Sequence, residues 1–394
     1  MRLKNKFKAS AAILAMGVIG GAFGVGASAQ TFDEKGLTFS GDGYELVIGG
    51  RLHLDSVNVS EDVTLFGDES DIRRFRLNAT LSMGKNWKAK IDGDVGGVST
   101  GWKNVWVSYK GFDNTTIKVG NFIAPFNNEN MMSSNNIKLM ERSLSATLAP
   151  NFLVGAAATY KGENWSLTGG YFENPLENDP LAIQDDGKSV VGRLVFSPIK
   201  EKRQALHFAV AAERRDLDTN ATSRIRANPE FGGLSGVALL DTTSLANVDS
   251  YSNFNIEAGY MSGPFLFKAQ RIARNNDAPT LGDPTYTGSN IEAAWVVTGE
   301  RQRYSSGSGT FGGIKPRRSS RFGAFEVAAR YSTLNLNDAS VAGGEQNNWT
   351  VGANWYVNRN ARLMLNYVSA ETKPGANGLN ENVDAVMGRF QINY

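Results

Sequence analysis

The sequence predicts an all-β protein, a transmembrane antiparallel β-barrel of about 16 strands with an inward-folded constriction loop. Three observations support this prediction. The chain begins with a segment typical of exported proteins, alternating apolar and polar residues recur along its length, and the last alternating run ends on the aromatic Tyr394. Such a final strand is typical of outer-membrane barrels, because one side of each strand faces lipid and the other faces water.

Residues 1–29 have the features of a secretory signal peptide. The first part of this segment contains no acid and four cations, which are Arg2, Lys4, Lys6 and Lys8. An apolar stretch follows, and Ala27-Ser28-Ala29 offers a cleavage site. A retained membrane anchor is the alternative, which the glycines between Gly17 and Gly26 disfavour. We expect cleavage after Ala29, which leaves residues 30–394 as a single transmembrane β-barrel domain with a formal net charge of −2 in place of +2.

Segments in which every second residue is apolar follow one another along the remaining chain, separated by Gly, Asn, Asp and Pro. In residues 73–83, for example, Phe75, Leu77 and Leu81 alternate with Arg74 and Arg76. The 16 candidate strands are 44–56, 70–83, 86–97, 103–111, 115–121, 146–160, 164–173, 188–198, 204–216, 251–261, 264–274, 288–299, 321–333, 347–358, 360–370 and 383–394. An even number closes an antiparallel barrel with both chain ends on the periplasmic side.

The connections between these strands differ in length and composition. Short turns such as 262–264 and 357–360 fit the periplasmic side. The long polar connections, which fit the extracellular side, are 217–250, 275–287, 300–320 and 371–382. The connection 122–145 follows a short strand and is rich in asparagine. Long loops tend to be functional, so we expect this one to fold inward as the constriction. An ordinary surface loop is the alternative.

Composition argues against several kinds of active site. The chain has no cysteine, which excludes thiol catalysis, disulfides and cysteine metal sites. Its histidines, His53 and His207, have no partner at the spacing of a metal site or a catalytic triad, and Ser305–Gly309 lacks phosphate-loop spacing. We therefore expect no enzyme activity, no catalytic or metal site, no cofactor and no nucleic-acid partner.

The strand faces opposite the apolar ones line the lumen of a barrel. In the first candidate strands these faces are dense in cations, and alternation assigns to them Arg51, Arg74, Arg76, Lys88, Lys90 and Lys118. Successive inward residues lie roughly 7 Å apart, so Arg74 and Arg76 are expected to form two rungs along an anion path. Guanidinium groups stay charged and match phosphate oxygens. The alternative is that these cations pair with acids, such as Asp92 and Asp94, and brace the barrel wall.

Arg73 breaks the alternation, because it would point outward beside Phe75 and Leu77. At the bilayer midplane an outward arginine costs about 2–4 kcal/mol. Arg73 is therefore expected at the strand end, near the headgroups, at a subunit contact, or at a bulge that turns it inward.

Basic residues also gather in the connections that we assign to the extracellular side. These residues are Arg224, Arg226, Arg301, Arg303, Lys315, Arg317, Arg318 and Arg321. They are suited to drawing anions toward the mouth of a pore or to binding lipopolysaccharide phosphates, and a role in solubility alone is the alternative.

Short motifs along the chain resemble those of the phosphate-selective porin O and P family. They are Gly49–Leu52, Ile72–Leu77, Asn86–Lys88, Val107–Phe112, Lys118–Phe122, Pro125–Phe126, Met140–Arg142, Thr298–Arg301, Phe311–Pro316, Gly323–Glu326, Arg330–Ser332, Asn354–Tyr356 and Asn366–Val368. They occur in order across residues 30–394. The resemblance implies a homotrimer of 16-stranded barrels, each with an arginine ladder leading to a phosphate-binding constriction.

The resemblance also implies roles for single residues. By position, Arg51, Arg73, Arg74 and Lys88 fall on the family's cationic constriction, Ser133 falls on its inward loop, and Arg224 and Arg226 fall on its ladder. Two positions depart from well-known phosphate-specific members. Asn130 stands where they have a lysine, and Lys103 stands where they have an acid. The central site is thus expected to keep an anion preference, with its phosphate specificity open.

The sequence as a whole predicts an outer-membrane porin for passive, anion-preferring diffusion of small solutes, with phosphate or polyphosphate as the expected cargo. Its expected pore-lining or anion-binding residues are Arg51, Arg73, Arg74, Arg76, Lys88, Lys90, Lys103, Lys118, Ser133, Arg224 and Arg226. Expected partners are inorganic phosphate or other small anions, outer-membrane lipids and lipopolysaccharide. A porin without phosphate specificity is the main alternative, ahead of an outer-membrane hydrolase or a structural barrel.

Overall fold

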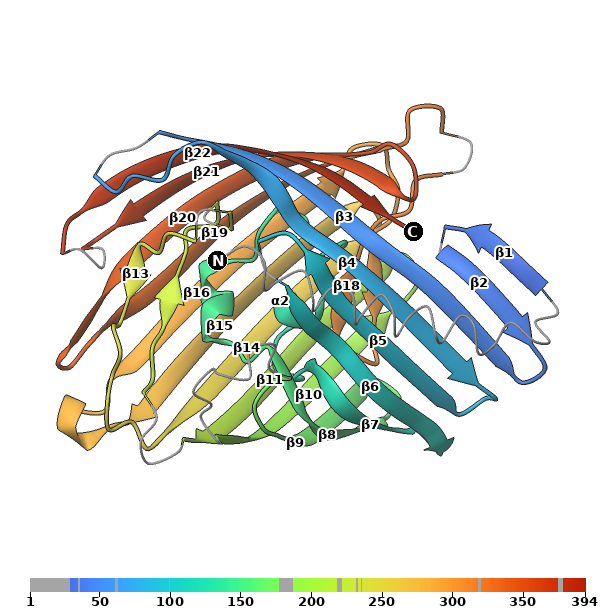
Figure 1. The fold of residues 1–394 in the computed structure, drawn as a ribbon, viewed down its shortest axis with the longest axis horizontal. Coiled ribbons are helices and arrows are strands. Elements are labelled where there is room, and N and C mark those ends of the chain that lie inside the picture. The colour runs from blue at the N-terminus through green and yellow to red at the C-terminus, as the bar shows by residue number, and fades with distance from the viewer. Residues whose placement is uncertain are drawn as a thin grey trace, which may run out of the picture.

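Sixteen antiparallel strands pair in sequence order, and the last pairs with the first, so that the sheet closes into a barrel (Figure 1). The computed structural model describes residues 29–34, 36–60, 63–98, 100–176, 187–217, 222–231, 233–234, 236–317, 320–374 and 378–394. Residues 1–28 of the expected signal peptide, and Arg318, lie outside these ranges. The predicted fold class and strand number are confirmed.

The strand bounds agree with the predicted segments to within a few residues at most ends. The barrel strands are β3 (Tyr44–Ser60), β4 (Glu69–Met83), β5 (Trp87–Gly96), β6 (Gly101–Phe112), β7 (Thr115–Ile123), β8 (Phe152–Lys161), β9 (Trp165–Phe172), β10 (Lys188–Lys200), β11 (Gln204–Asp216), β14 (Ser250–Ser262), β15 (Phe265–Asp277), β16 (Thr285–Val296), β19 (Ala324–Asp338), β20 (Val341–Tyr356), β21 (Ala361–Thr372) and β22 (Glu381–Asn393). The predicted start at residue 146 is wrong, because the 3-10 helix η1 (Leu144–Leu148) precedes β8.

Two strands that the sequence pattern did not reveal precede the barrel. β1 (Ala29–Asp33) and β2 (Gly36–Gly41) form a hairpin, and β2 pairs with Tyr44–Ile48 at the start of β3. β22 pairs with the rest of β3, from Arg51 to Ser60. Tyr394 lies where the two pairings meet, and its backbone N donates to Gly50 O over 3.1 Å. This N-terminal ribbon projects beside the C-terminus (Figure 1).

The two faces of the barrel wall differ as alternation predicts. Outward positions carry exposed apolar and aromatic side chains, including the stacked pairs Phe265–Trp295 and Phe325–Trp355. Inward positions carry buried polar groups such as Arg193, Asn253 and Gln346. This division suits a wall between lipid and a polar interior. No helix in the described ranges is long and apolar enough to cross a membrane.

One end of the barrel, here called the turn end, carries the short connections at 84–86, 113–114, 162–164, 201–203, 263–264 and 357–360. The opposite end is the loop end. Residues 297–323, which include β17 (Arg303–Ser305) and β18 (Thr310–Gly312), connect β16 to β19 at the turn end. Gln302 N, for example, donates to Gly263 O over 2.9 Å. The assignment of 300–320, and of its basic residues, to the extracellular loops is therefore wrong.

The connections at the loop end vary in how they fold. The β11–β14 loop contains the small ribbon of β12 (Arg226–Ala227) and β13 (Leu240–Asp241). Between β15 and β16 lies the 3-10 helix η2 (Pro279–Leu281). β19 and β20 are joined by a tight hairpin, in which Asp338 pairs with Val341.

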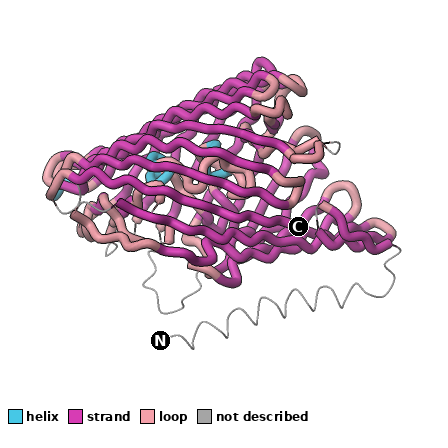
Figure 2. The backbone as a smooth tube through the Cα atoms, turned by 90° about the horizontal axis from the view of Figure 1, so that it is seen from above, coloured by secondary structure: helices cyan, strands magenta, loops and turns pink. Residues whose placement is uncertain are grey.

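The constriction loop, residues 124–151, folds into the lumen as predicted, and its helical turns lie inside the ring of strands (Figure 2). It contains α2 (Asn128–Met131), whose N-cap Asn127 accepts a hydrogen bond from Asn130 N. Phe126, Leu144 and Leu148 of this loop join a buried apolar cluster with Leu240 of the β11–β14 loop. Apolar burial between loops thus fills part of an interior that a bare barrel of this size would leave to water.

Irregular pairing concentrates in the strands that carry the predicted cations. The β3–β4 register shifts between His53 and Leu54, which leaves Arg73 as an extra residue between Ile72 and Arg74. Further shifts occur in the β4–β5, β5–β6 and β6–β7 pairs. A bulge changes the direction in which a side chain points. Arg73 lies at such a bulge, which turns its side chain inward, and this is one of the placements predicted for it.

Replacing Gly120 by alanine is expected to destabilise the barrel by about 1–3 kcal/mol. Gly120 in β7 has φ of +126°, and a Cβ there would lie 2.2 Å from the carbonyl oxygen of Val105. The measurement is the temperature at which the folded barrel loses its compact mobility on a denaturing gel. Gly169→Ala in β9 is the control, because its added Cβ meets nothing within 4 Å. Equal losses in both variants would contradict the prediction.

Candidate functional site

A cavity of about 670 Å³ lies in the lumen between strands β4–β7 and the constriction loop. Its cationic lining residues are Arg51, Arg73, Arg74, Arg76, Lys90, Lys103, Lys118, Arg142 and Arg226. Its carboxylates are Asp92, Asp94, Glu141 and Glu230. The excess of cations makes the cavity attractive to anions.

The structure brings nine of the eleven predicted residues to this cavity, Ser133 among them. Lys88 and Arg224 are not part of its lining. Lys88 is exposed nearer the turn end, in register with Ser108, which in turn pairs with Lys118. Arg224 points to Asp241 in the β12–β13 ribbon, with Nε 2.8 Å from Oδ1.

Several of the predicted cations are ion-paired and brace the wall. Arg76 forms two hydrogen bonds to Asp94, of 2.9 and 2.8 Å. Arg73 likewise donates to both oxygens of Glu141, over 2.8 and 3.1 Å. Lys90 lies 3.2 Å from Asp92. These residues therefore pair with acids and brace the barrel wall, which is the alternative given above. Arg76 in particular is not an unpaired cation along an anion path.

Three cations of the cavity have donors or charge left over. Arg51 donates to the hydroxyls of Ser133 and Ser134 over 3.3 and 2.8 Å, and its Nε has no partner among the described residues. Arg74 approaches Glu141 at 3.6 Å, and its Nη1 is likewise unpartnered in the described chain. Lys118 lies over the rings of Trp106 and Phe122, at 4.7 and 5.0 Å, without an ion pair to a described acid. All three side chains line the cavity, and none has a carboxylate at hydrogen-bond distance among the described residues.

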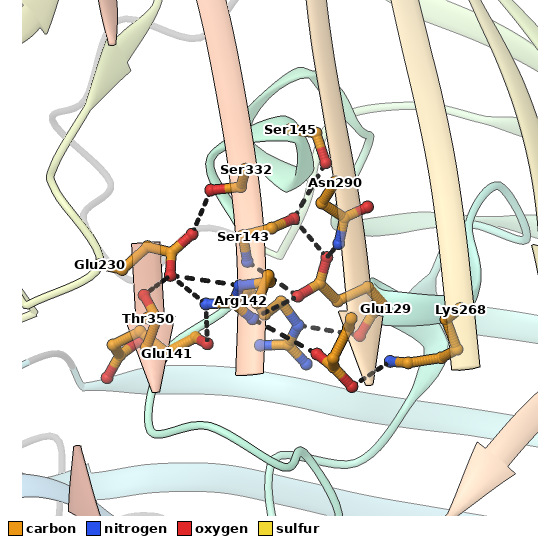
Figure 3. A network of polar contacts seen from close by, with 12 residues as sticks. Glu129, Glu141, Arg142, Ser143, Ser145, Glu230, Lys268, Asn290, Ser332 and Thr350 are labelled. Atoms are coloured by element: carbon orange, nitrogen blue, oxygen red, sulfur yellow. Dashed lines mark hydrogen bonds and ion pairs between the residues drawn. The ribbon is translucent and has the colours of Figure 1, made fainter. Parts of the chain in front are cut away.

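Two carboxylates fix the constriction loop to the barrel wall. Glu129 accepts hydrogen bonds from Ser143 N and Oγ, over 2.8 and 2.6 Å, and from Arg330 Nη1 of β19 over 3.3 Å (Figure 3). Glu141 binds Arg73 of β4 and Arg389 of β22, the latter over 3.1 Å. These arginines come from one arc of the wall, which runs from β19 through β22 and β3 to β4, so the loop is fixed to that part of the barrel.

The arginines that hold the loop have further partners. Arg330 also binds Glu230 of the β11–β14 loop, which accepts from Ser332 and Thr350 as well (Figure 3). Arg389 forms two hydrogen bonds of 2.6 Å to Asp55. No sequence signal connected either arginine to acids in distant loops.

The two departures from the family pattern lie on the same cavity. Asn130 is buried and donates through Nδ2 to Pro150 O over 3.3 Å. Lys103 lies 3.8 Å from Asp94 and 5.9 Å from the ring of Phe152. Lys103 and Asn104 both line the cavity although they are consecutive, which the β5–β6 register shift permits. The constriction loop thus has an amide at position 130, and the barrel wall has a cation at position 103.

The histidines have partners that sequence spacing did not indicate. His53 contacts Asn135 of the constriction loop at 3.1 Å. His207 lies between Glu257, at 3.0 Å, and Tyr304 OH, at 2.8 Å, and that hydroxyl contacts Ser197 at 2.6 Å. The serine thus meets the tyrosine and not the imidazole, so no serine–histidine pair forms here. Among the described residues no cluster of three or more His, Asp or Glu suits a metal ion.

The closed barrel and its loop-lined passage define a β-barrel pore protein of the outer membrane. A family model described as phosphate-selective porin O and P matches residues 47–394. The chain therefore belongs to this porin family, as the motifs predicted. It is 27% identical to Porin O of Pseudomonas aeruginosa over 434 aligned residues, which cover 95% of this chain and 98% of that one.

Solved structures share the fold at low sequence identity. The anion-selective porin from Comamonas acidovorans matches with a TM-score of 0.54 and 11% identity, covering 89% of this chain and 100% of that one. OmpT, an outer membrane protein of Vibrio cholerae, matches with a TM-score of 0.56 and 11% identity, covering 90% and 99%. Both likenesses concern the barrel architecture.

The attachment of the constriction loop through Glu141 is expected to weaken in acid. Burial raises the pKa of Glu141, but the charges of Arg73, Arg74 and Arg389 hold it well below the ordinary 4.5. The stabilisation from this attachment is therefore fully present above about pH 4.5, decreases below that value, and is lost as the pH falls through the lowered pKa of the folded state. Measured unfolding temperatures should fall with pH less steeply in Glu141→Gln than in the unchanged protein. Glu45→Gln, at an exposed position of β3, is the control. Parallel curves for Glu141→Gln and the unchanged protein would contradict the prediction.

Proposed function

We propose that the protein is a passive, anion-preferring porin. The observation that carries this proposal is the constriction cavity, in which nine cations face four carboxylates. Three of the cations, Arg51, Arg74 and Lys118, retain unpartnered donors or an uncompensated charge within the described chain. Membership of the porin family supports the same reading.

The arrangement of these charges favours passage over retention. One pair of unit charges at ~4 Å contributes about 1 kcal/mol in water and ~4 kcal/mol at an effective dielectric constant of 20. Millimolar binding corresponds to roughly 4 kcal/mol, so three cations closing on one divalent anion would hold it too long for conduction. Asp92 and Asp94 lower the local potential, and Lys90, Lys103 and Lys118 remain partly exposed. Partly hydrated cations spread along a passage attract an anion and still release it.

We propose inorganic phosphate or polyphosphate as the cargo. The family description and the arginines of the cavity support this choice, since guanidinium donors match phosphate oxygens in pairs. Asn130 and Lys103 bear on how selective the site is. Lys103 places a cation on the wall, whereas Asn130 leaves an amide on the loop. Cations therefore enclose a phosphate less completely in this chain than they would with a lysine at position 130.

The remaining parts of the proposal concern assembly and location. We propose export by a signal peptide cleaved after Ala29, a homotrimer, and lipopolysaccharide phosphates as outer-leaflet partners. A trimer form of Vibrio cholerae OmpT has been solved, and its fold resembles this one. For the lipid contact we propose Arg214, which is exposed on the outer wall at the loop end and also lies 3.2 Å from Asp216. No catalytic activity is part of the proposal.

Charge removal at the unpaired cations is expected to lower the anion preference. In planar bilayers with a salt gradient, Arg51→Gln and Lys118→Gln should each reduce the anion-to-cation permeability ratio by about twofold to fivefold. The matched control is the double variant Arg76→Ala/Asp94→Ala, which removes a neutral pair from the same wall and should leave the ratio nearly unchanged. Cation selectivity of the unchanged protein, or the absence of stepwise conductance, would overturn the anion-porin proposal.

Restoring the loop lysine is expected to strengthen phosphate recognition. In Asn130→Lys/Lys103→Asp, a cation on the loop would face Arg51 and Arg74 across the cavity, so phosphate should block the chloride current at about tenfold lower concentration. The double variant has a lower net charge, so tighter block would reflect the placement of the cations. Asn130→Lys alone serves as the comparison. Unchanged or weaker block in the double variant would show that these two positions do not set phosphate specificity.

A further inference from the structure

A second cavity, of about 250 Å³, continues the passage toward the turn end. Ser133 lines both this cavity and the constriction cavity, so the two are neighbours along one path. The cations of this exit cavity are Arg303, Lys315, Arg359 and Arg362. Arg303 and Lys315 belong to residues 297–323, which fold to the turn end, and Arg359 lies in the turn between β20 and β21.

A carboxylate from the N-terminal ribbon pairs with two of the four cations of the exit cavity. Glu34, in the turn between β1 and β2, is the acid among the described residues that line this cavity. Its Oε1 accepts a hydrogen bond from Lys315 Nζ over 2.9 Å, and its Oε2 accepts from Arg359 Nη1 over 2.6 Å. Asn360 Nδ2 also approaches Glu34 O at 3.4 Å. The carboxylate therefore uses both oxygens, as a permeating oxyanion would.

Glu34 remains ionised under ordinary conditions. Hydrogen bonds from Arg359 and Lys315 lower its pKa to about 2. Its side chain is partly exposed to solvent, at 23%, and it lies in a short hairpin turn rather than in the barrel wall. A partly solvated charge pair of this kind is weak enough to exchange partners with an arriving anion.

We propose that Glu34 is a tethered carboxylate that competes with the permeating anion for Lys315 and Arg359, and so promotes anion release at the turn end. The inference rests on the proposed anion-porin function and adds a residue that sets its exit step. An anion that passes Ser133 meets two cations, Lys315 and Arg359, that already share the single negative charge of Glu34. It displaces the carboxylate briefly and leaves when the carboxylate returns, so the exit does not become a trap.

A purely structural role for Glu34 is the competing explanation, because the same contacts tie the ribbon to the barrel. The two roles differ in their dependence on charge. Glutamine at position 34 can still bond to Lys315 and Arg359 through its amide oxygen, whereas it no longer neutralises them. Asp42→Asn is the matched control, since Asp42 is an exposed acid of the same ribbon, in the turn between β2 and β3.

The test compares phosphate block of the chloride current in planar bilayers, with phosphate added to one compartment at a time. In Glu34→Gln we expect phosphate added at the turn end to block at about threefold to tenfold lower concentration, with a smaller change for phosphate added at the loop end. Asp42→Asn should behave as the unchanged protein. If phosphate blocks Glu34→Gln and Asp42→Asn at the same concentration, the proposal is overturned. The anion selectivity of the unchanged channel, and hence the proposed function, would not be affected by that result.

A single cysteine supplies an independent check, because the chain has none of its own. Glu34→Cys should show the stronger phosphate block. Reaction from the turn-end compartment with an anionic sulfonate-bearing thiol reagent should reverse it, whereas a neutral reagent of similar size should not. Equal effects of the two reagents would show that bulk or ribbon attachment matters rather than charge, and would overturn the proposal.

Discussion

The pairing of buried charges inside the barrel is the interaction on which the constriction depends. Moving an ion from water into a protein interior costs several kcal/mol after relaxation, so each buried carboxylate of the constriction loop needs a cation nearby. Glu129 finds Arg330 on β19, and Glu141 finds Arg73 on β4 and Arg389 on β22. These partners lie on separate strands of the wall. The loop consequently has one position in which all its charges are satisfied, and that position defines the passage.

The same requirement divides the cations of the passage into two groups. Those with a carboxylate at hydrogen-bond distance, such as Arg76 beside Asp94, stabilise the wall. Those without one, such as Arg51, donate to hydroxyl groups instead. Backbone irregularity makes this division possible, because register shifts in β3–β7 turn consecutive residues to the same side. Strict alternation would have sent Arg73 into the lipid.

Alternation of apolar and polar residues was enough to predict sixteen strands and five of the nine cations that line the cavity, since lipid on one side and water on the other impose a period of two. It failed where the backbone departs from that period, at Arg73 and at Lys103 with Asn104. Partners such as Glu141 and Arg389 are far apart in sequence, and no local pattern encodes their meeting.

The misplacement of residues 300–320 had another cause. The length and polarity of residues 300–320 are typical of an extracellular loop, although their position in the strand order contradicts that assignment. A connection that follows the twelfth of sixteen antiparallel strands must lie at the same end as the chain termini. Counting strands was therefore a better guide than composition, because topology fixes the end of the barrel whereas loop composition does not.

The shared border at Ser133 gives the passage an order of events. In the proposed porin, an anion that crosses the barrel by this path passes from the constriction cavity to the exit cavity beside Ser133. The rate of transport is then limited by the slowest transfer of the anion from one set of cations to the next. Once solute occupies the passage most of the time, a steeper gradient adds little. A cell that needs faster uptake gains it by placing more copies of the barrel in its membrane.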